Sequence, residues 1–473
     1  MLLGSRTIHF LNLRRALMDV VMLSRIQFGL TSAFHYIYPP LSIGIGLMLV
    51  IFEGFYLKTK NVLYQKIAKF WTKIFALTFA LGVATGLVQL FGFGTNWANY
   101  SRFVGDVFGS ALGAEGIFAF FLEAGFLGVM LFGWERCSPK FHYFATICVA
   151  CGAHFSAIWI VVANSWMQTP AGHIIAGEGR QAHAIIHNFW EMVFNPSSAD
   201  RLIHVILGCW LAGIFCILSV SSYYYLKKCH TQFTKATLRI SLVAAAFVLI
   251  LQLISADSTA RGVAKNQPSK LAAMEGIYVT EPNTPITLFG WTDDATKTVK
   301  GLKIPGLLSF LVFHDFTTPV MGFDQIPEDE RPPIQVVFQS YHMMIAMWSL
   351  MALLTILACI QYRRKKLVHS KWILRGLVIS VLFPQIANFS GWMTAEVGRQ
   401  PWIVYGILKT VDGVSTNIHK DQVFFSIVMF LVIYALLFAL FIYLLNHKIQ
   451  HGPEDALQIQ QDLVYRDPFE KEV

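Results

Sequence analysis

Residues 201–226 read RLIHVILGCWLAGIFCILSVSSYYYL. After Arg201 this run carries no formal charge, and it exceeds the roughly 20 apolar residues that an α-helix needs to cross a bilayer. His204 lies at its beginning. A second apolar run, 334–361, places Met344 about three turns inside its own start. The chain is therefore predicted to be an integral membrane protein with a histidine and a methionine inside its apolar segments.

The composition of the whole chain agrees with this prediction. Of 473 residues, 55% are hydrophobic and 14% are charged, and the mean hydropathy is +0.53. These values exclude an ordinary soluble multidomain protein. The net charge of +9 indicates basic loops and acidic lipid, and no nucleic-acid partner is expected. We predict an all-α protein with nine transmembrane helices at 27–55, 71–93, 111–133, 141–166, 203–226, 236–255, 334–361, 372–394 and 421–446.

The distribution of basic residues predicts the orientation of these helices. The four short loops on one side carry 14 Lys and Arg, whereas the three short loops on the other side carry 6. The positive-inside rule then places the C-terminus in the cytoplasm and the N-terminus outside. Arg6, Arg14 and Arg15 oppose this orientation, and the conflict weakens if translation starts at Met18.

The chain divides into membrane and non-membrane parts. Residues 1–17 are expected to be a start-site extension or disordered. Helices one to six are expected within 18–255 and helices seven to nine within 333–447, followed by a cytoplasmic tail, 448–473. Residues 256–332 are polar and contain seven prolines. A loop of this length is expected to be functional or disordered, and it is predicted to lie on the outer side.

Several ionisable residues lie inside the apolar runs, where such residues usually mark functional sites. His35 and Glu115 are expected in the first two turns of their spans, His204 at the start of its span and Glu396 at the outer end of the eighth. Pro39 removes a backbone donor one turn after His35, so a kink is expected there. An imidazole and a thioether, as in His204 and Met344, suit a low-spin haem iron. Each residue also has an ordinary structural interpretation. A buried histidine commonly makes polar contacts between membrane helices, and a buried methionine commonly fills space in a core.

Glu115 and Glu123 are eight residues apart in the third span. This spacing places them close to one face of a helix, with Glu123 about 12 Å deeper at ~1.5 Å per residue. Two carboxylates inside a membrane indicate a proton or ion path, or a pair satisfied by neighbouring helices.

Five stretches carry a resemblance to a known family. They are Ser24-Arg25-Ile26-Gln27-Phe28 leading to His35, Phe79-Ala-Leu-Gly82-Val-Ala-Thr85-Gly86, Phe93-Gly-Thr-Asn-Trp97, Gln267-Pro-Ser-Lys270-Leu-Ala-Ala-Met-Glu275 and Gly398-Arg-Gln-Pro-Trp402. Their sequences and order, from residue 18 to about 446, resemble subunit I of cytochrome bd-type quinol oxidases, of the class with a short quinol loop.

The resemblance implies a set of roles for individual residues. His204 and Met344 match the axial ligands of a low-spin haem b. The resemblance also places His35, Glu115 and Glu396, with Arg399 and Trp402, at a high-spin haem b and a haem d, or at a third haem b. Gln267, Lys270 and Glu275 match the quinol-binding loop, and Glu123 and Ser156 match a proton route from the cytoplasm.

The resemblance also implies a reaction and partners. It implies a terminal oxidase of the bacterial inner membrane that oxidises ubiquinol or menaquinol outside and reduces O2 to water. Charge separation without pumping would then generate the proton motive force. A second membrane subunit, and small accessory subunits in some members, are expected. Two departures concern the stretch Gln89-Leu90-Phe91-Gly92, where the family often has Met-Glu-Phe-Gln so that a carboxylate is missing here, and His342, where an arginine is frequent.

Two other functions remain open from the residues alone. A di-haem membrane anchor that passes electrons between quinone and a soluble partner explains His204 and Met344, but not the ligand-type residues His35, Glu115 and Glu396. A proton-coupled transporter explains the carboxylates without any haem. Two observations distinguish the oxidase, the anchor and the transporter: whether the purified protein contains haem, and whether that haem binds carbon monoxide.

Overall fold

The computed structural model describes residues 19–453. Within that range, eight helices are long and apolar enough to cross a membrane, and a ninth span is formed by two helices bent by 40°. This confirms the predicted all-α membrane fold, and the number of spans reaches the predicted nine when the bent pair is counted as one span. The predictions for residues 1–17, and for the tail beyond 453, lie outside the described residues. The orientation of the bundle in the membrane stays a prediction.

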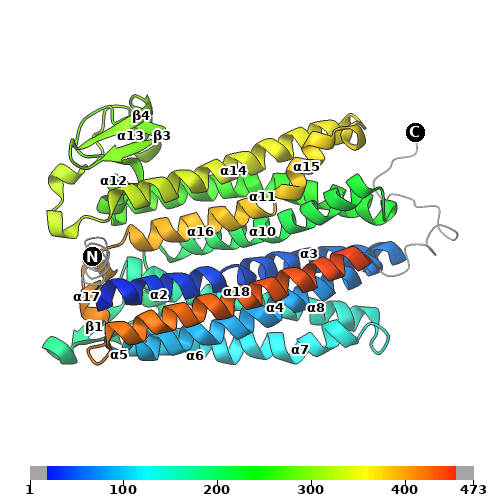
Figure 1. Cartoon of the computed structure of the whole chain (residues 1–473), viewed down its shortest axis with the longest axis horizontal. Helices are drawn as coiled ribbons and strands as arrows, with labels where there is room; N and C mark the ends of the chain where they lie inside the picture. The colour runs from blue at the N-terminus through cyan, green and yellow to red at the C-terminus, as the bar shows by residue number, and fades with distance from the viewer. Residues whose placement is uncertain (1–18, 454–473) are drawn as a thin grey trace, which may run out of the picture.

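The spans lie side by side in one elongated bundle (Figure 1). Their bounds are α2 Val20–His35 with α3 Tyr38–Thr59, α4 Val62–Thr95, α6 Gly105–Ala114 with α7 Phe120–Phe132, α8 Pro139–Gln168, α10 Ser198–Lys227, α11 Thr231–Asn266, α14 Ile334–Arg363, α15 Lys371–Ile379 with α16 Leu382–Val397, and α18 Lys420–His451.

Three of the nine spans are interrupted. The first is interrupted at residues 36–37, between α2 and α3, and α3 has Pro39 and Pro40 in its first turn, so the expected break is present. The third contains a π-helical turn, Glu115–Ala119, between α6 and α7. The eighth is the bent pair α15 and α16. Interruptions of this kind inside a membrane are tolerated where neighbouring helices satisfy the freed backbone groups.

The short elements gather at one end of the bundle, which we call the loop face (Figure 1). They are the helices α5 Ala98–Phe103, α9 Phe189–Val193, α12 Pro268–Glu275, α13 Leu307–Phe313 and α17 Thr410–Gly413, and the strands β1 His173–Ala176, β2 His183–Ile186, β3 Ile286–Asp293, β4 Thr298–Ile304, β5 Trp402–Val404 and β6 Leu408–Lys409. The strands form three antiparallel hairpins, β1–β2, β3–β4 and β5–β6. The fold is therefore helical within the membrane, with small hairpins outside it.

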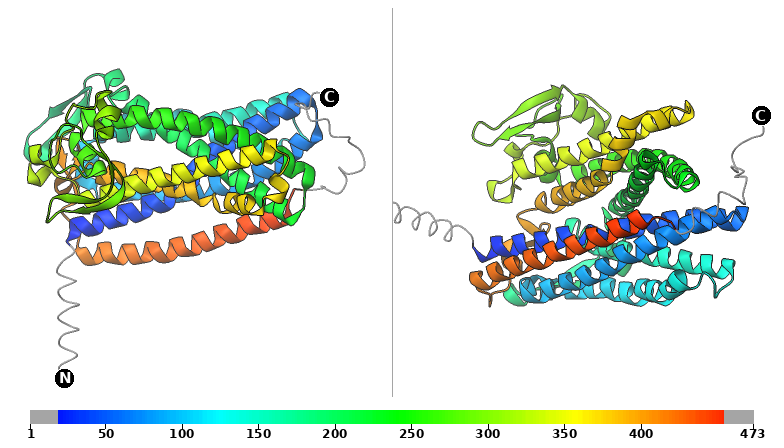
Figure 2. Two further views of the ribbon diagram at one scale, coloured as in Figure 1. Left: turned by 90° about the horizontal axis from the view of Figure 1, so that it is seen from above. Right: turned by 45° about the vertical axis from the view of Figure 1, so that its right-hand side comes forward.

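The polar segment 256–332 is folded rather than irregular. Its first 11 residues continue α11 to Asn266, beyond the predicted end of the sixth span at 255. The rest forms α12, the β3–β4 hairpin and α13 around a small apolar cluster that includes Leu271, Phe323 and Val337. This unit packs against the loop-face ends of α11 and α14 (Figure 2).

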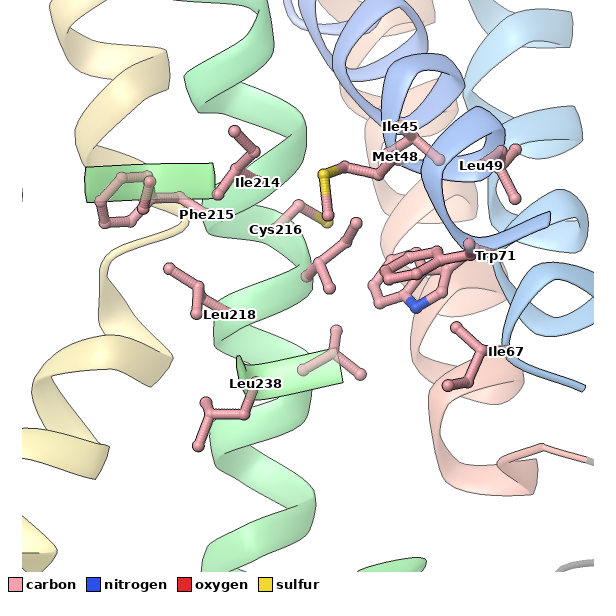
Figure 3. Packing of buried hydrophobic residues seen from close by; sticks show 14 of the residues in the cluster. Ile45, Met48, Leu49, Ile67, Trp71, Ile214, Phe215, Cys216, Leu218 and Leu238 are labelled. Carbon is pink, nitrogen blue, oxygen red and sulfur yellow. The ribbon is translucent and has the colours of Figure 1, made fainter. Parts of the chain in front are cut away.

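The central core lies where α3, α4, α10 and α11 meet (Figure 3). It contains Met48, Trp71, Ile214 and Phe215 among its fully buried side chains. Helices α3 and α10 cross in backbone contact, because a Cβ built on Gly44 would lie 2.3 Å from the carbonyl oxygen of Cys209. Small residues at such crossings let membrane helices approach closely. This core fixes α10, which carries His204, against the rest of the bundle.

Candidate functional site

A buried polar network surrounds Glu396 at the end of α16. Asn164 and Gln168, both from α8, donate hydrogen bonds of 3.0 and 3.1 Å to its Oε1 atom. Arg399 donates to its Oε2 atom at 2.5 Å. Arg201, from the beginning of α10, donates to the amide oxygen of Asn164. The carboxylate is therefore held directly by three side chains, one of which is the guanidinium of Arg399, and Arg201 reinforces the network through Asn164.

Lys270 joins this network from α12. Its amine donates to the side-chain oxygens of Gln168 and Gln267, each at 2.5 Å, and Gln267 also donates to Gln168 at 3.0 Å. Burial, reinforced by Arg201 and Arg399, lowers the pKa of the Lys270 amine well below its usual value. Gln267 and Lys270, which were predicted to bind quinol, are thus connected to Glu396 through a single side chain, Gln168.

Glu275 lies at the other end of α12 and faces different neighbours. Its side chain is buried, and its Oε2 atom has no hydrogen-bond partner among the described residues. Burial raises the pKa of this carboxyl to about 7, although Tyr341 and the backbone of Thr287 partly favour the charged form. A buried carboxyl that titrates near neutral pH is suited to accept and release protons.

His204 and Met344 lie on opposite helices of a four-helix ring. In this ring α10 packs against α11, α11 against α14, α14 against α16, and α16 against α10. The amide nitrogen of Gln252 on α11 lies 3.1 Å from Nδ1 and 3.2 Å from Nε2 of His204. A Cβ built on Gly391 of α16 would lie 2.8 Å from the sulfur of Met344. Facing side chains in a bundle interior form a common type of cofactor site.

His35 lies at the break of the first span. Its Nδ1 atom is 2.9 Å from the hydroxyl of Thr85, and a Cβ on Gly86 would lie 3.2 Å from its Cε1 atom. Because α2 begins at Val20, His35 is about 22 Å along its helix at ~1.5 Å per residue. The helix begins seven residues before the predicted start of the first span at 27, because Ser24 and Arg25 interrupt the apolar run, and the depth of His35 in the membrane stays a prediction.

Glu115 and Glu123 both face α8. The hydroxyl of Ser156 donates to Glu115 at 2.5 Å. One turn earlier on α8, a Cβ on Gly152 would lie 2.6 Å from Cγ of Glu123. The π-helical turn explains the alignment, since its smaller rotation per residue brings the eight-residue spacing back to one face. Glu115 is ten residues inside its span, which begins at Gly105, and not in the first turn as predicted.

The remaining motif residues stabilise the loop face. Arg399 also donates to the carbonyl of Trp402 at 3.2 Å, so Trp402 takes part in the network only through its backbone. Gln27 and Asn96, from two separate motifs, hydrogen-bond each other, and Phe28 packs against Trp97 with ring centroids 6.2 Å apart. These motifs connect α2 to the end of α4, which is a structural role.

The two departures from the family pattern also have defined surroundings. In the first, Leu90 stands in place of the glutamate and is exposed, and the preceding Gln89 accepts a hydrogen bond of 3.1 Å from Ser32. His342 places Nδ1 at 2.8 Å from the Phe338 carbonyl and Nε2 at 2.6 Å from the Thr287 carbonyl. His342 therefore joins α14 to the 256–332 segment through both ring nitrogens.

Sequence reasoning missed several polar partners. Gln168, Asn164 and Gln252 are uncharged side chains in apolar helices, so no spacing or charge pattern distinguishes them. It also missed the fully buried pair of Glu53 and His142, whose Oε1 and Nδ1 atoms are 2.6 Å apart. The isolated charges of Glu53 and His142 in long apolar helices were the available signal.

The fold and these buried side chains define a polytopic membrane protein whose histidine, methionine and carboxylate groups suit haem. Residues 23–453 match the family model described as cytochrome bd terminal oxidase subunit I. The chain therefore belongs to this family, and it is a membrane-spanning subunit of a respiratory terminal oxidase of haem-containing type.

Individual relatives and a solved structure agree over nearly the whole length. The chain is 37% identical to the cytochrome bd ubiquinol oxidase subunit 1 of Bacillus subtilis (strain 168), over 96% of this chain and 99% of that protein. It is 33% identical to the cytochrome bd-II ubiquinol oxidase subunit 1 of Escherichia coli (strain K12), over 94% and 98%. The bd oxidase from Geobacillus thermodenitrificans superimposes with a TM-score of 0.84 at 30% identity, covering 92% of this chain and 99% of that one.

Proposed function

We propose that this subunit oxidises a quinol at the loop face and carries the haems through which O2 is reduced to water. The observation that carries the proposal is the direct connection from Lys270 through Gln168 to Glu396. It joins a side chain outside the membrane spans to a carboxylate inside the bundle. A quinol bound near α12 would therefore lie next to the residues proposed to hold a haem.

The proposed quinol site uses both ends of α12. Lys270 and Gln267 would hold a quinol oxygen, because their polar atoms already converge on Gln168. Glu275, with a pKa near 7, would accept a quinol proton and pass it to the aqueous side. Ubiquinol and menaquinol both offer the hydroxyl groups that this arrangement needs.

The residues present fit a set of haem groups. His204 and Met344 would hold a low-spin haem b, and His35, Glu115 and Glu396 would serve a high-spin haem b and a haem d, or a third haem b. Bound haem would supply electron transfer and O2 binding. Arg201 and Arg399 exceed Glu396 in charge, and the Nη1 atom of Arg399 is buried without a hydrogen-bond partner among the described residues. A haem propionate is anionic and would fit beside the two arginine side chains.

Protons for water formation would arrive from the opposite side of the membrane. Glu123 and Glu115 line one face of α7 and the π-helical turn, and Ser156 bonds Glu115. Together they would form the inner part of a proton route. If quinol protons leave on the outer side, charge crosses the membrane without pumping. Moving each charge against the membrane potential requires about 2.3 kcal/mol per 100 mV.

The proposed assembly includes a second membrane subunit of the oxidase, and small accessory subunits where the species has them. In the single chain, apolar side chains of α4 and α7 such as Phe91 and Phe121 are exposed, which suits contact with another membrane protein or with lipid. The predicted location is the bacterial inner membrane.

The decisive experiment is a spectroscopic assay of the purified complex. A pyridine haemochrome assay should identify two or more haems per complex. A carbon monoxide difference spectrum should show at least one haem with an open position. A colourless protein would indicate a transporter, and haem that does not bind carbon monoxide would indicate an electron-transfer anchor.

A further inference from the structure

The β3–β4 hairpin presents an apolar face that nothing in the described chain covers. Phe289 and Trp291 on β3 are 65% and 63% exposed, and Leu302 on β4 is 51% exposed. Phe289 pairs with Leu302 across the hairpin, and Trp291 pairs with Lys300. The exposed face is therefore continuous across both strands, and an apolar surface of this kind usually contacts protein or lipid.

The hairpin lies along the side of a membrane span rather than beyond its end. Three contacts join it to α14, in order along the helix: Thr292 to Gln335, Gly290 to Gln339, and Thr287 to His342. These helix positions span seven residues, or about 10 Å at ~1.5 Å per residue. The hairpin thus occupies the same level as the first two turns of α14.

This part of α14 also faces outward from the bundle. Val336 and Met343 are exposed, as expected for the lipid-facing side of a span. The hairpin lies beside the loop-face end of α14, on the side away from the other helices, in both views (Figures 1 and 2). Its apolar face is therefore close to the outward surface that α14 presents to the membrane.

The polar residues of the hairpin are ordered along its length. Lys300 pairs with Trp291 on the apolar face, towards the turn, whereas Asp293, Asp294 and Lys297 lie at the turn itself. Because β3 runs from the His342 level to the Gln335 level, the turn points away from the middle of the membrane. Tryptophan beside lysine is typical of membrane–water interfaces, where the lysine stem extends to the headgroups.

We propose that the exposed face of the β3–β4 hairpin is a membrane-interface anchor that lies among phospholipids of the leaflet at the loop face. The apolar side chains Phe289, Trp291 and Leu302 contact acyl chains. Lys300 reaches the headgroups. The turn at 294–297 stays in water.

The anchor would affect the quinol site, and this consequence rests on the proposed function. Gly276, next to Glu275, packs directly on the hairpin, since a Cβ there would lie 2.6 Å from Cγ2 of Val299. The backbone of Thr287 also lies beside the Glu275 carboxyl. A hairpin fixed in the leaflet would hold this wall of the site towards the lipid phase, from which a long-chain quinol arrives.

Lipid contact is tested by photocrosslinking in the assembled oxidase. The complex is reconstituted in vesicles of phosphatidylcholine with a diazirine in the acyl chain, irradiated, digested and mapped by mass spectrometry. Adducts are expected on 286–291 and 302–304 and not on 294–297. Phe425 of α18, which is 70% exposed, is the positive control. Labelling of α18 without labelling of β3 overturns the proposal, as do protein crosslinks from β3 to another subunit in place of lipid adducts.

Paired variants test the consequence for the quinol site. Phe289→Asp with Trp291→Asp should raise the KM for a long-chain quinol about tenfold, as expected when binding loses roughly 1.4 kcal/mol. The KM for a short, water-soluble quinol should stay unchanged. Ala295→Asp with Lys297→Gln changes the charge equally at the turn and should alter neither value. Equal effects on both quinols overturn the proposed link.

Two further readouts keep the outcomes distinct. If the double aspartate variant loses haem, Trp291→Ser alone replaces it in the same comparison. If Glu275 proves unnecessary for quinol oxidation, the proposed function fails while the lipid adducts on β3 remain, so the two failures are distinguishable.

Discussion

The amine of Lys270 donates a 2.5 Å hydrogen bond to the side-chain oxygen of Gln168. The amide nitrogen of the same glutamine donates to Glu396 at 3.1 Å. One uncharged side chain therefore connects a lysine outside the membrane spans to a carboxylate inside them. Neither end of this connection reveals the other in the sequence, because more than 120 residues separate them.

Replacing Gln168 by methionine keeps the volume but removes both hydrogen bonds. Losing a buried hydrogen bond to a charged group costs about 1.5–3 kcal/mol, so quinol oxidation should slow by roughly tenfold or more while haem content stays normal. Steady-state oxygen uptake with quinol measures the change. Gln325→Met is the control, because Gln325 bonds only Asp324 at an exposed site. Equal rates in both variants would contradict the proposed connection.

Glu275→Gln should lower quinol oxidation and leave the haem spectra intact. The pKa of the carboxyl is about 7, so the proton-accepting form increases as pH rises through 7. In the unaltered protein kcat/KM should therefore rise about tenfold per pH unit below 7 and level off above it. The variant should lack this rise.

The matched control for Glu275 is Asp315→Asn. Asp315 lies in the same segment, but hydrogen bonds from Thr318 and Thr317 lower its pKa to about 2. It is ionised throughout the range, and its variant should keep the full pH profile. A pH profile in Glu275→Gln that equals the original one would exclude Glu275 as the proton acceptor.

Met344→Leu should preserve assembly, since the two side chains have similar volumes. It removes the thioether, so the low-spin haem b should show a lowered potential or high-spin character, with slower quinol oxidation. Redox titration and optical spectra measure both. Met343→Leu is the control, because this neighbouring methionine is exposed and points elsewhere. An unchanged low-spin spectrum in Met344→Leu rules out Met344 as a ligand.

Glu123→Gln should slow the oxygen-reducing step and the accompanying charge movement, while quinol still reduces the low-spin haem at first. The amide keeps the size and hydrogen bonding of the carboxyl but does not ionise near neutral pH. Single-turnover electrometry in vesicles, with haem content measured beside it, tests this. Glu135→Gln, at a side chain that is 88% exposed, should behave as the original protein. Full haem occupancy with undiminished voltage would exclude Glu123 from the route.

Gly152→Ala should weaken the packing of α7 against α8. Its Cβ would lie 2.6 Å from Cγ of Glu123 and 3.0 Å from the carbonyl oxygen of Ala119, and such overpacking typically costs about 1–3 kcal/mol. Thermal loss of haem from the purified complex should occur at a lower temperature. Gly125→Ala on α7 is the control, because nothing lies within 4 Å of its added Cβ. Equal stability would mean that the two helices separate without cost.

The sequence alone determined the spans, because crossing a bilayer requires long apolar helices whose backbone groups bond internally. Nine such runs are visible in the composition, and the break after His35 follows from Pro39. Charged residues in apolar runs identified Glu115, Glu123 and Glu396, since burying a charge in a membrane has a high free-energy cost. The predicted starts of two helices were too late, because α2 and α6 begin at Val20 and Gly105, before the polar residues Ser24-Arg25 and Asp106 that interrupt the apolar pattern.

Only the tertiary structure decided which of these residues meet. The convergence of Gln168, Asn164 and Arg201 on Glu396 depends on the packing of α8, α10 and α16. The alignment of Glu115 with Glu123 depends on a π-helical turn that no residue pattern predicts. The segment 256–332 has no periodicity because its α12, β3 and β4 are short and are stabilised by contacts with α14. Hydropathy indicates whether a residue favours lipid or water. Which residue it contacts is decided by the packing of helices that lie far apart in the chain.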